Sequence, residues 1–263
     1  MVRTYAARML RIGAHCEATD PRAEAAARDT ETVQFFLGDP QGWKPPPPRD
    51  DVETLRSSGL TIYVHAPYLV NVASTNNKIR IPSRKILAEH AQGAADIGAA
   101  GLIVHGGHVT KGSDMEEGLV NWRKTFERWT PPLPILIENT AGGDNAVCRR
   151  FDVLARLWDT IGEFGVGFCL DTCHAHAGGE ELLGIVDRVK SLTGRIDLVH
   201  ANDSKDTFDS GRDRHENFGR GQIDPALIVA VIEAAGAPVI CETPGGREGQ
   251  AADIAYLRRK LPA

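Results

Sequence analysis

The sequence predicts a single-domain α/β protein with the (β/α)8 barrel fold, also called a TIM barrel. Short, strand-like apolar runs alternate eight times with longer segments of helical composition. The apolar runs are mostly continuous, as expected for parallel strands that are covered on both faces. Eight such units in 263 residues give roughly 33 residues per unit, the size of a compact barrel of this kind.

The individual elements follow from these patterns. The predicted strands, in chain order, are Leu10–Cys16, Thr32–Leu37, Leu60–His65, Gly101–His105, Pro134–Glu138, Val166–Asp171, Ile196–His200 and Pro238–Glu242. Apolar residues recur with a period of about 3.6 in the segments between them, which predicts helices. These helices are Pro21–Arg28, Asp51–Ser57, Ser83–Gly98, Glu116–Trp129, Phe151–Ile161, Glu180–Leu192, Pro225–Ala235 and Gln250–Leu261.

A doubly wound sheet is the alternative architecture. Such a sheet usually has a glycine-rich phosphate-binding turn after its first strand, and "GAHCEA" (13–18) is not one. The proline run at 45–48 lies between a strand and a helix and predicts a stiff loop, because consecutive prolines form an extended helix. We therefore predict a barrel domain over residues 9–263, preceded by a disordered extension at residues 1–8.

Composition excludes several classes of protein. The hydrophobic share of 42% and the charged share of 25% are those of an ordinary soluble protein. No apolar stretch reaches the roughly 18 residues that a membrane span needs, and the first ten residues lack a secretory signal. The five cysteines are an odd number and fit reduced, buried thiols in the cytoplasm. The formal charge of −5 argues against a polyanionic partner unless bound metal adds positive charge.

Six consecutive predicted strands end in a residue that can bind a metal ion. In a barrel of this kind the active site forms at the carboxyl ends of the strands. A single histidine at such a position is more often a packed core or loop residue, but six such residues in one ring favour a metal site. The six are His65, His105, Glu138, Asp171, His200 and Glu242.

Two pairs in the loops indicate the same chemistry. Asp171 and His174 are three residues apart, so that a strand-end carboxylate and a histidine of the following turn can converge. Asp213 and His215 are two apart in "GRDRHENFG", and on an extended segment both side chains face one way. The full set holds five histidines, two aspartates and two glutamates, which exceeds the roughly four ligands of one zinc ion.

The donor set therefore predicts a cluster of two or three ions. Imidazole and carboxylate without thiolate favour zinc, manganese or iron. Cys169 and Cys173 are left out of the site, because Cys169 is expected to point into the packed interior.

Four segments of the chain contain most of the predicted ligands: "HAPYLVNVAS" (65–74), "IENTAGG" (137–143), "VGFCLDTCHAHAGG" (166–179) and "LVHANDSKDTFDSGRDRHENFGRGQI" (198–223). They resemble the signature segments of the endonuclease IV family, the zinc-dependent apurinic/apyrimidinic endonucleases of DNA repair. The likeness extends from about Leu10 to the end of the chain and is greatest to the shorter actinobacterial members. It implies a barrel with a trinuclear zinc site and hydrolysis of the phosphodiester 5′ to an abasic site.

The resemblance also assigns ligands. One Zn²⁺ would be held by His65, His105 and Glu138. A second would be held by Asp171, His200 and Glu242, with Glu138 bridging the two. The third would be held by His174, Asp213 and His215, and Mn²⁺ or Fe²⁺ could replace zinc.

The mechanism that follows is attack by a hydroxide bridging the first two ions, leaving a 3′-hydroxyl, with trimming of blocked 3′ ends at the same site. The expected partner is double-stranded DNA with abasic sites or blocked 3′ ends, bound by a cytoplasmic, nucleoid-associated monomer. Three Zn²⁺ carry six positive charges, so the net charge no longer opposes DNA.

Family analogy places the contacts to an extrahelical abasic nucleotide at Tyr68, Leu69 and the loop Gly38–Lys44. Better-known members carry an arginine and a glutamine where this chain has Gln41 and Gly42, which predicts a weaker wedge into the duplex. Three further polar residues adjoin predicted ligands: Asn139, Asn202 and Lys205. Each could hold a metal ligand in position by a hydrogen bond, contact a phosphate or lie on the surface. The remaining histidines match no family ligand; they are His15, His90, His108 and His176. Of these, His90 is expected to be packed or on the surface.

Two other functions remain open at this point. A sugar isomerase or epimerase shares the barrel and a metal ring, but has no use for His174 or the pair Asp213 and His215. A barrel that only binds a ligand would have lost some of the nine positions, and none is missing.

Overall fold

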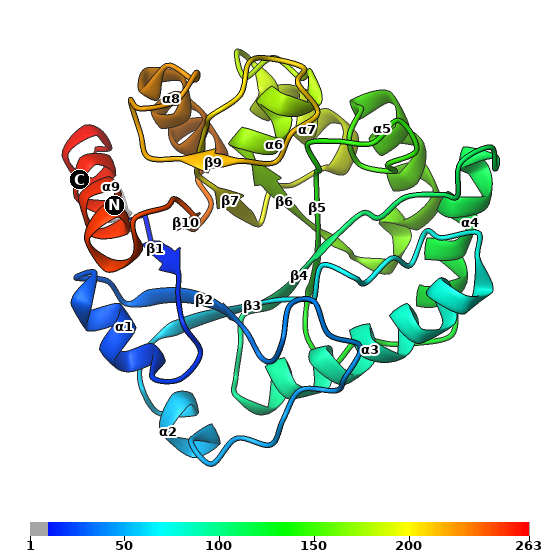
Figure 1. Cartoon of the computed structure of the whole chain (residues 1–263), viewed down its shortest axis with the longest axis horizontal. Coiled ribbons are helices and arrows are strands. Elements are labelled where there is room, and N and C mark those ends of the chain that lie inside the picture. Colours follow the sequence, from blue (N-terminus) through cyan, green and yellow to red (C-terminus); the bar gives the residue numbers. More distant parts are fainter. Residues whose placement is uncertain (1–9, 263) are drawn as a thin grey trace, which may run out of the picture.

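The computed structural model describes residues 10–262 and shows a closed barrel of eight parallel strands (Figure 1). The barrel closes because β1 pairs with both β2 and β10. The predicted fold and all eight predicted strands are confirmed, whereas the extension predicted at residues 1–8 lies outside the described residues. The barrel strands are β1 Ile12–His15, β2 Thr32–Phe36, β3 Thr61–His65, β4 Gly101–His105, β5 Ile135–Glu138, β6 Gly167–Asp171, β7 Leu198–His200 and β10 Val239–Cys241.

Helices surround the barrel and connect its strands (Figure 1). The outer helices are α1 Pro21–Ala27, α2 Val52–Arg56, α3 Asn77–Asp96, α4 Met115–Phe126, α5 Phe151–Ile161, α7 Ile185–Thr193, α8 Pro225–Ala235 and α9 Gly246–Lys260, with the 3-10 turn η1 at Gly162–Phe164. The prediction that α3 starts at Ser83 was wrong. The helix starts at Asn77, because the side chain of Asn76 caps the backbone N–H of Lys78 and Pro82 is tolerated inside the helix.

Two further elements lie in the loops at the carboxyl end of the barrel, and sequence patterns did not predict them. A short helix, α6 (Thr172–Gly178), follows β6 directly. A two-stranded antiparallel ribbon joins β8 (Asp203–Ser204) to β9 (His215–Glu216). Both elements carry residues of the predicted metal site, so they decide where those residues lie.

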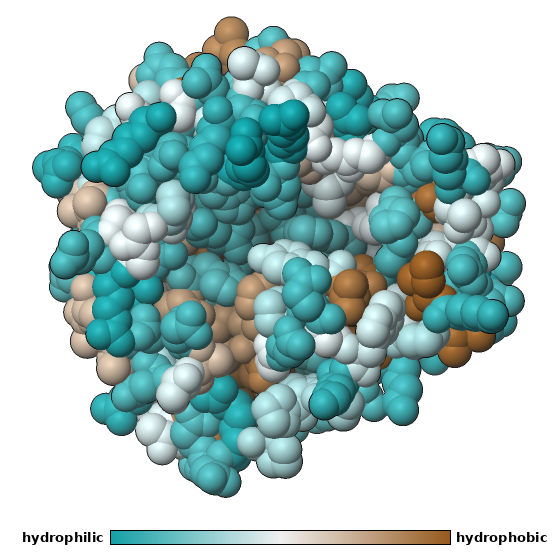
Figure 2. Space-filling view, viewed as in Figure 1, coloured by the Kyte–Doolittle hydropathy of each residue, from teal (hydrophilic) through white to brown (hydrophobic). Residues whose placement is uncertain are grey.

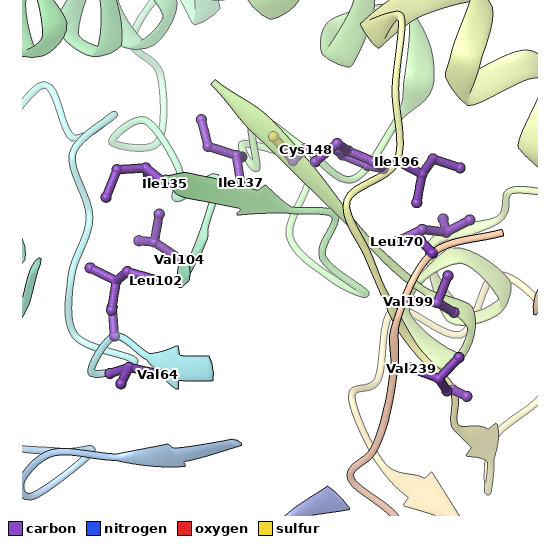
Figure 3. Packing of buried hydrophobic residues seen from close by; sticks show 14 of the residues in the cluster. Val64, Leu102, Val104, Ile135, Ile137, Cys148, Leu170, Ile196, Val199 and Val239 are labelled. Atoms are coloured by element: carbon purple, nitrogen blue, oxygen red, sulfur yellow. The ribbon is translucent and has the colours of Figure 1, made fainter. Parts of the chain in front are cut away.

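The core has an inner and an outer layer. The inner layer fills the barrel with one side chain from each of six strands: Tyr63, Ile103, Leu136, Cys169, Leu198 and Ile240. Each of these residues precedes a predicted ligand on its strand by two positions, so both face the barrel interior. The outer layer packs between strands and helices, and Figure 3 shows its members on successive strands, among them Val64, Ile137 and Val199. The ligand ring therefore lies directly above a buried, mainly apolar layer.

The candidate metal centre

The predicted ligands meet at the carboxyl end of the barrel. Five of them are the last residues of β3, β4, β5, β6 and β7, and Glu242 follows directly after β10. Their donor atoms form groups within 4.8 Å of one another, and these groups together include all nine predicted residues. In the orientation of Figure 1, the molecular surface is hollowed near the middle, with hydrophilic residues above the hollow and hydrophobic residues below it (Figure 2).

Glu138 lies at the centre of the arrangement and is fully buried. Its Oε2 atom is 3.1 Å from Nε2 of His65 and 3.3 Å from Nε2 of His105. Its Oε1 atom is 2.9 Å from Nδ1 of His200. The two oxygens of one carboxylate thus face two different groups of donors.

The group on the Oε1 side contains two more carboxylates. Oε2 of Glu242 is 3.3 Å from Nδ1 of His200, and Oδ2 of Asp171 is 3.9 Å from the same nitrogen. Asp171 and His200 are completely buried. Three carboxylates around one imidazole nitrogen, away from water, require a compensating positive charge.

The third group is built from the loops. Oδ1 of Asp213 is 3.1 Å from Nε2 of His174 and 3.2 Å from Nε2 of His215. Asp171 caps α6 by accepting a hydrogen bond of 2.7 Å from the backbone N–H of His174, which fixes the start of that helix. The side chain of Asp213 is 49% exposed, so this group is open to the hollow.

A close approach between two loops positions Asp213. A Cβ atom added to Gly142, after β5, would lie 2.2 Å from the carbonyl oxygen of Gly211. Only glycine allows the backbones to come this close. The loop that carries Asp213 is therefore held against the loop that follows Glu138.

The carboxylates and histidines of the centre shift one another's pKa values. Burial alone opposes ionisation of Glu138, but the charges of His200 and His105 outweigh it and lower the pKa of Glu138 well below its usual value. Burial likewise lowers the pKa of a histidine, yet Asp171 and Asp213 raise that of His174 well above its ordinary value. The buried carboxylates of the site therefore stabilise positive charge beside them.

The residues present fit metal ions. The Nε2 atoms of His174 and His215 are buried and make no hydrogen bond within the described residues, although both point at Asp213. Buried imidazole nitrogens without hydrogen bonds, aimed at a carboxylate, are the donors that a divalent transition metal takes. The buried clusters of histidine, glutamate and aspartate are thus consistent with several metal ions.

Two cysteines lie beside these groups but do not change the chemistry. The sulfur atoms of Cys169 and Cys173 lie within the same donor groups. Burial raises the pKa of each thiol to about 12, which disfavours the thiolate form that binds metal. Cys169 belongs to the inner core layer, as predicted, and all five cysteines of the chain are buried and free within the described residues.

Two asparagines support the ligands. Asn139 exchanges two hydrogen bonds with the backbone of Asp171, at 2.8 and 3.0 Å. Asn202 donates to Oδ2 of Asp171 at 2.7 Å and accepts from the backbone N–H of Glu242 at 2.8 Å. Both asparagines are buried, so the alternative that they are surface residues is wrong. Lys205 is exposed, and its Nζ atom lies 3.8 Å from Oε2 of Glu216.

The residues predicted to contact DNA border the same mouth. Tyr68 is half exposed, and its backbone N–H donates to the carbonyl of Pro40, which ties its loop to the loop of the exposed Gln41. Tyr68 and Leu69 also line a cavity of about 410 Å³ that reaches His105. Trp43 lines the same cavity, and sequence reasoning did not single it out.

The fold and the site define a class of protein, and comparisons agree with it. The family model described as a xylose isomerase-like TIM barrel matches residues 23–260. A solved D-tagatose 3-epimerase-like protein shares the fold with a TM-score of 0.79 at 19% identity, covering 96% of this chain and 97% of that one. The class is thus a TIM barrel with candidate metal sites, and a likeness at 19% identity reports the fold alone.

The nearer relatives narrow the class to one family. A probable endonuclease 4 from Mycobacterium bovis (strain BCG / Pasteur 1173P2) is 59% identical over 249 residues, covering 95% of this chain and 98% of the relative. A probable endonuclease 4 from Mycobacterium leprae is 58% identical with the same coverage. The crystal structure of endonuclease IV from Thermus thermophilus matches with a TM-score of 0.82 at 30% identity, over 95% of this chain and 98% of that one. The chain belongs to the endonuclease IV family.

Proposed function

We propose that this protein is a zinc-dependent endonuclease of DNA repair. It hydrolyses the phosphodiester on the 5′ side of an abasic site in duplex DNA, leaves a 3′-hydroxyl, and removes blocking groups from 3′ ends. The observation that carries the proposal is the position of Glu138, whose two oxygens face two separate donor groups beside a third. Family membership supplies the substrate class.

The ligand sets are proposed as follows. His65, His105 and Glu138 would hold one ion, and Asp171, His200 and Glu242 the second, with Glu138 shared between them. The third ion would be held by His174, Asp213 and His215. When bound, such ions supply a nucleophilic water at neutral pH and neutralise charge on the phosphate.

The chain's own residues prepare the site for this chemistry. Glu138 keeps its charge, because the neighbouring histidines lower its pKa. Burial raises the pKa of Tyr68, so its phenol keeps the proton that it can donate to a phosphate oxygen. Contacts with His65, His105 and His200 hold Glu138 in place before DNA arrives, which lowers the cost of ordering it in the reaction.

The cavity beside His105 fits a flipped nucleotide. Its aromatic members, Trp43 and Tyr68, offer faces on which a sugar or base can stack. We assign DNA contacts to Tyr68, Leu69 and Gln41, on the two loops that border the mouth. All nine proposed ligands come from one chain, so a monomer suffices for activity. The free, buried cysteines suit the cytoplasm, and within residues 10–262 no helix has the length and hydropathy to cross a lipid bilayer.

The sharpest test combines metal analysis with cleavage. Full-length protein loaded with zinc should contain about three ions per chain, as two bridged sites and one further site require. It should cut a duplex carrying a single abasic analogue, and a chelator should abolish the cut until zinc is restored. A loaded preparation with about one ion per chain, inactive on this duplex but active on a ketose, would instead establish the epimerase function.

A further inference from the structure

Two barrel strands, β1 and β2, contribute none of the proposed ligands, yet both send a polar side chain to the centre. Gln34 on β2 is fully buried, and His15 ends β1. The two residues are paired in register across the strands. Gln34 interrupts the apolar run "TVQFF", and no part of the proposed ligand set accounts for it.

Gln34 makes two hydrogen bonds to proposed ligands. Its Oε1 atom lies 2.8 Å from Nε2 of His200, and its Nε2 atom donates to Oε1 of Glu242 at 2.6 Å. Its Nε2 also lies 3.0 Å from Nδ1 of His15. The side chain thus spans two ligands that come from different strands.

Chemistry fixes the direction of these bonds. The Glu242 carboxylate can only accept, so the amide must turn its NH2 group toward it. The carbonyl oxygen then faces His200 and can only accept, so Nε2 of His200 carries a hydrogen. That leaves Nδ1, 2.9 Å from Oε1 of Glu138, as the nitrogen that faces the metal centre.

Other histidines of the centre are oriented differently. Nδ1 of His65 lies 2.7 Å from the carbonyl of Ala66, and Nδ1 of His174 lies 2.9 Å from the carbonyl of Asn139. In these cases the backbone fixes the ring. For His200 a side chain does so, and a side chain can be replaced.

We propose that Gln34 is a positioning residue that selects the tautomer of His200 and holds Glu242 beside it. Glutamine suits this task because it both donates and accepts without a charge. Glutamate could not donate to Glu242 when ionised, and lysine could not accept from His200. The inference deepens the proposed function and rests on it, since it takes His200 and Glu242 to be metal ligands.

The test is the Gln34→Met variant, which keeps the length of the side chain and removes both hydrogen bonds. Co²⁺ titration followed by visible absorption, with a competing chelator, reads metal affinity without DNA. We expect one ion to bind about 10–100-fold more weakly, the range typical when a partner of a metal ligand is lost, with an altered Co²⁺ spectrum. On abasic duplex, kcat should fall while KM stays nearly constant, because Gln34 has no exposed surface.

Gln250→Met is the matched control. Gln250 is also buried, but its amide bonds to Arg28 and to the backbone of His15 and Thr243. This variant should lower stability and leave Co²⁺ affinity and spectrum unchanged. If Gln34→Met does not fold, as judged by circular dichroism, Gln34→Ala adds no atoms and should show the same loss of affinity.

The outcomes separate the two proposals. Wild-type affinity and spectrum in a folded Gln34 variant would overturn the positioning role, even if the wild type cuts abasic DNA. Weakened metal binding in a variant of a protein that never cuts abasic DNA would support the positioning role and overturn the endonuclease.

Discussion

Two buried histidines in different regions of this molecule have pKa values shifted in opposite directions. His90 lies on α3 in the outer layer, 1% exposed, and neither ring nitrogen meets the geometry of a hydrogen bond within the described residues. Burial lowers its pKa to about 4, and a contact with the backbone of Lys44 opposes this without cancelling it. His200, at the barrel mouth, is fully buried, and burial by itself lowers its pKa too. Cys169, Glu242 and Glu138 nevertheless raise it well above its ordinary value.

The difference shows what marks a cation site. Removal from water alone makes a histidine neutral, as at His90. At the mouth, the neighbouring carboxylates outweigh that effect, so the surroundings of His200 favour positive charge. His90 was predicted to be packed or on the surface, and the structure shows that it is packed. No carboxylate of the described residues is among the groups that shift its pKa, which distinguishes it from the histidines proposed as ligands.

The largest effect should come from removing the carboxylate at the centre. Glu138→Gln keeps the shape of the side chain and removes its charge from two donor groups. We expect cleavage of abasic duplex to fall by about 10³-fold or more even with zinc restored, because metal-borne charge stabilisation is worth several kcal/mol. Metal analysis should show loss of at least one ion.

The matched control for this variant is Glu24→Gln. Glu24 is also buried, but it is held by Arg28 and Arg247 outside the mouth. It should lose stability and keep its metal content. Equal activity of Glu138→Gln and wild type would remove Glu138 from the shared position.

A smaller effect is expected at the open third group. Asp213→Asn leaves His174 and His215 in place, so we expect one ion to bind more weakly, by at least the roughly 10–100-fold that is typical when a group supporting a metal ligand is lost. Dialysis against a graded chelator should release this ion first. Asp209→Asn, in the same loop and similarly exposed, bonds to Arg149 and Arg150 and should leave metal affinity unchanged. Loss of two or more ions in Asp213→Asn would show that the three groups are not separable.

The smallest effect concerns His90 and leaves activity intact. Its pKa is about 4 in the folded protein and 6.5 in the unfolded chain, so the unfolded chain binds more protons between these values. The stability that this residue contributes is fully present above pH 6.5 and is lost as the pH falls toward 4. At pH 5 the loss is about 2 kcal/mol.

Urea unfolding at pH 8 and pH 5 measures this effect. The fall in the free energy of unfolding should be smaller in His90→Leu than in the wild type. In the same experiment, the exposed His108→Leu should behave as the wild type. An identical pH dependence in His90→Leu would mean that folding leaves the pKa of His90 unchanged, and the contrast with the mouth would disappear.

The ring of ligands could be read from the sequence because strands impose a simple geometry. Six of the eight apolar runs ended in a polar residue, and parallel strands of a barrel bring their ends to one rim. His65, His105 and Glu138 needed no more than that. The pair Asp213 and His215 was predicted from its spacing, but its place against His174 depends on β9 and on the contact between Gly142 and Gly211.

Other features left no local signal. In the sequence, Gln34 is a single polar residue within a strand. Its hydrogen-bond partners, His200 and Glu242, are more than 160 positions away in the chain. Trp43 reads as one residue of a proline-rich loop, although it lines the cavity with Tyr68. The early start of α3 depended on the cap at Asn76, which the proline at position 82 concealed.

The sequence by itself determined the barrel, its eight strands and the chemical types that surround its mouth, because periodicity and strand ends are properties of neighbouring residues. Only the tertiary structure decided which oxygen of Glu138 faces which histidine, how the loops close the third group and which side chain orients His200. These depend on distances between residues far apart in the chain, and such distances are set by closure of the barrel and by packing of its loops.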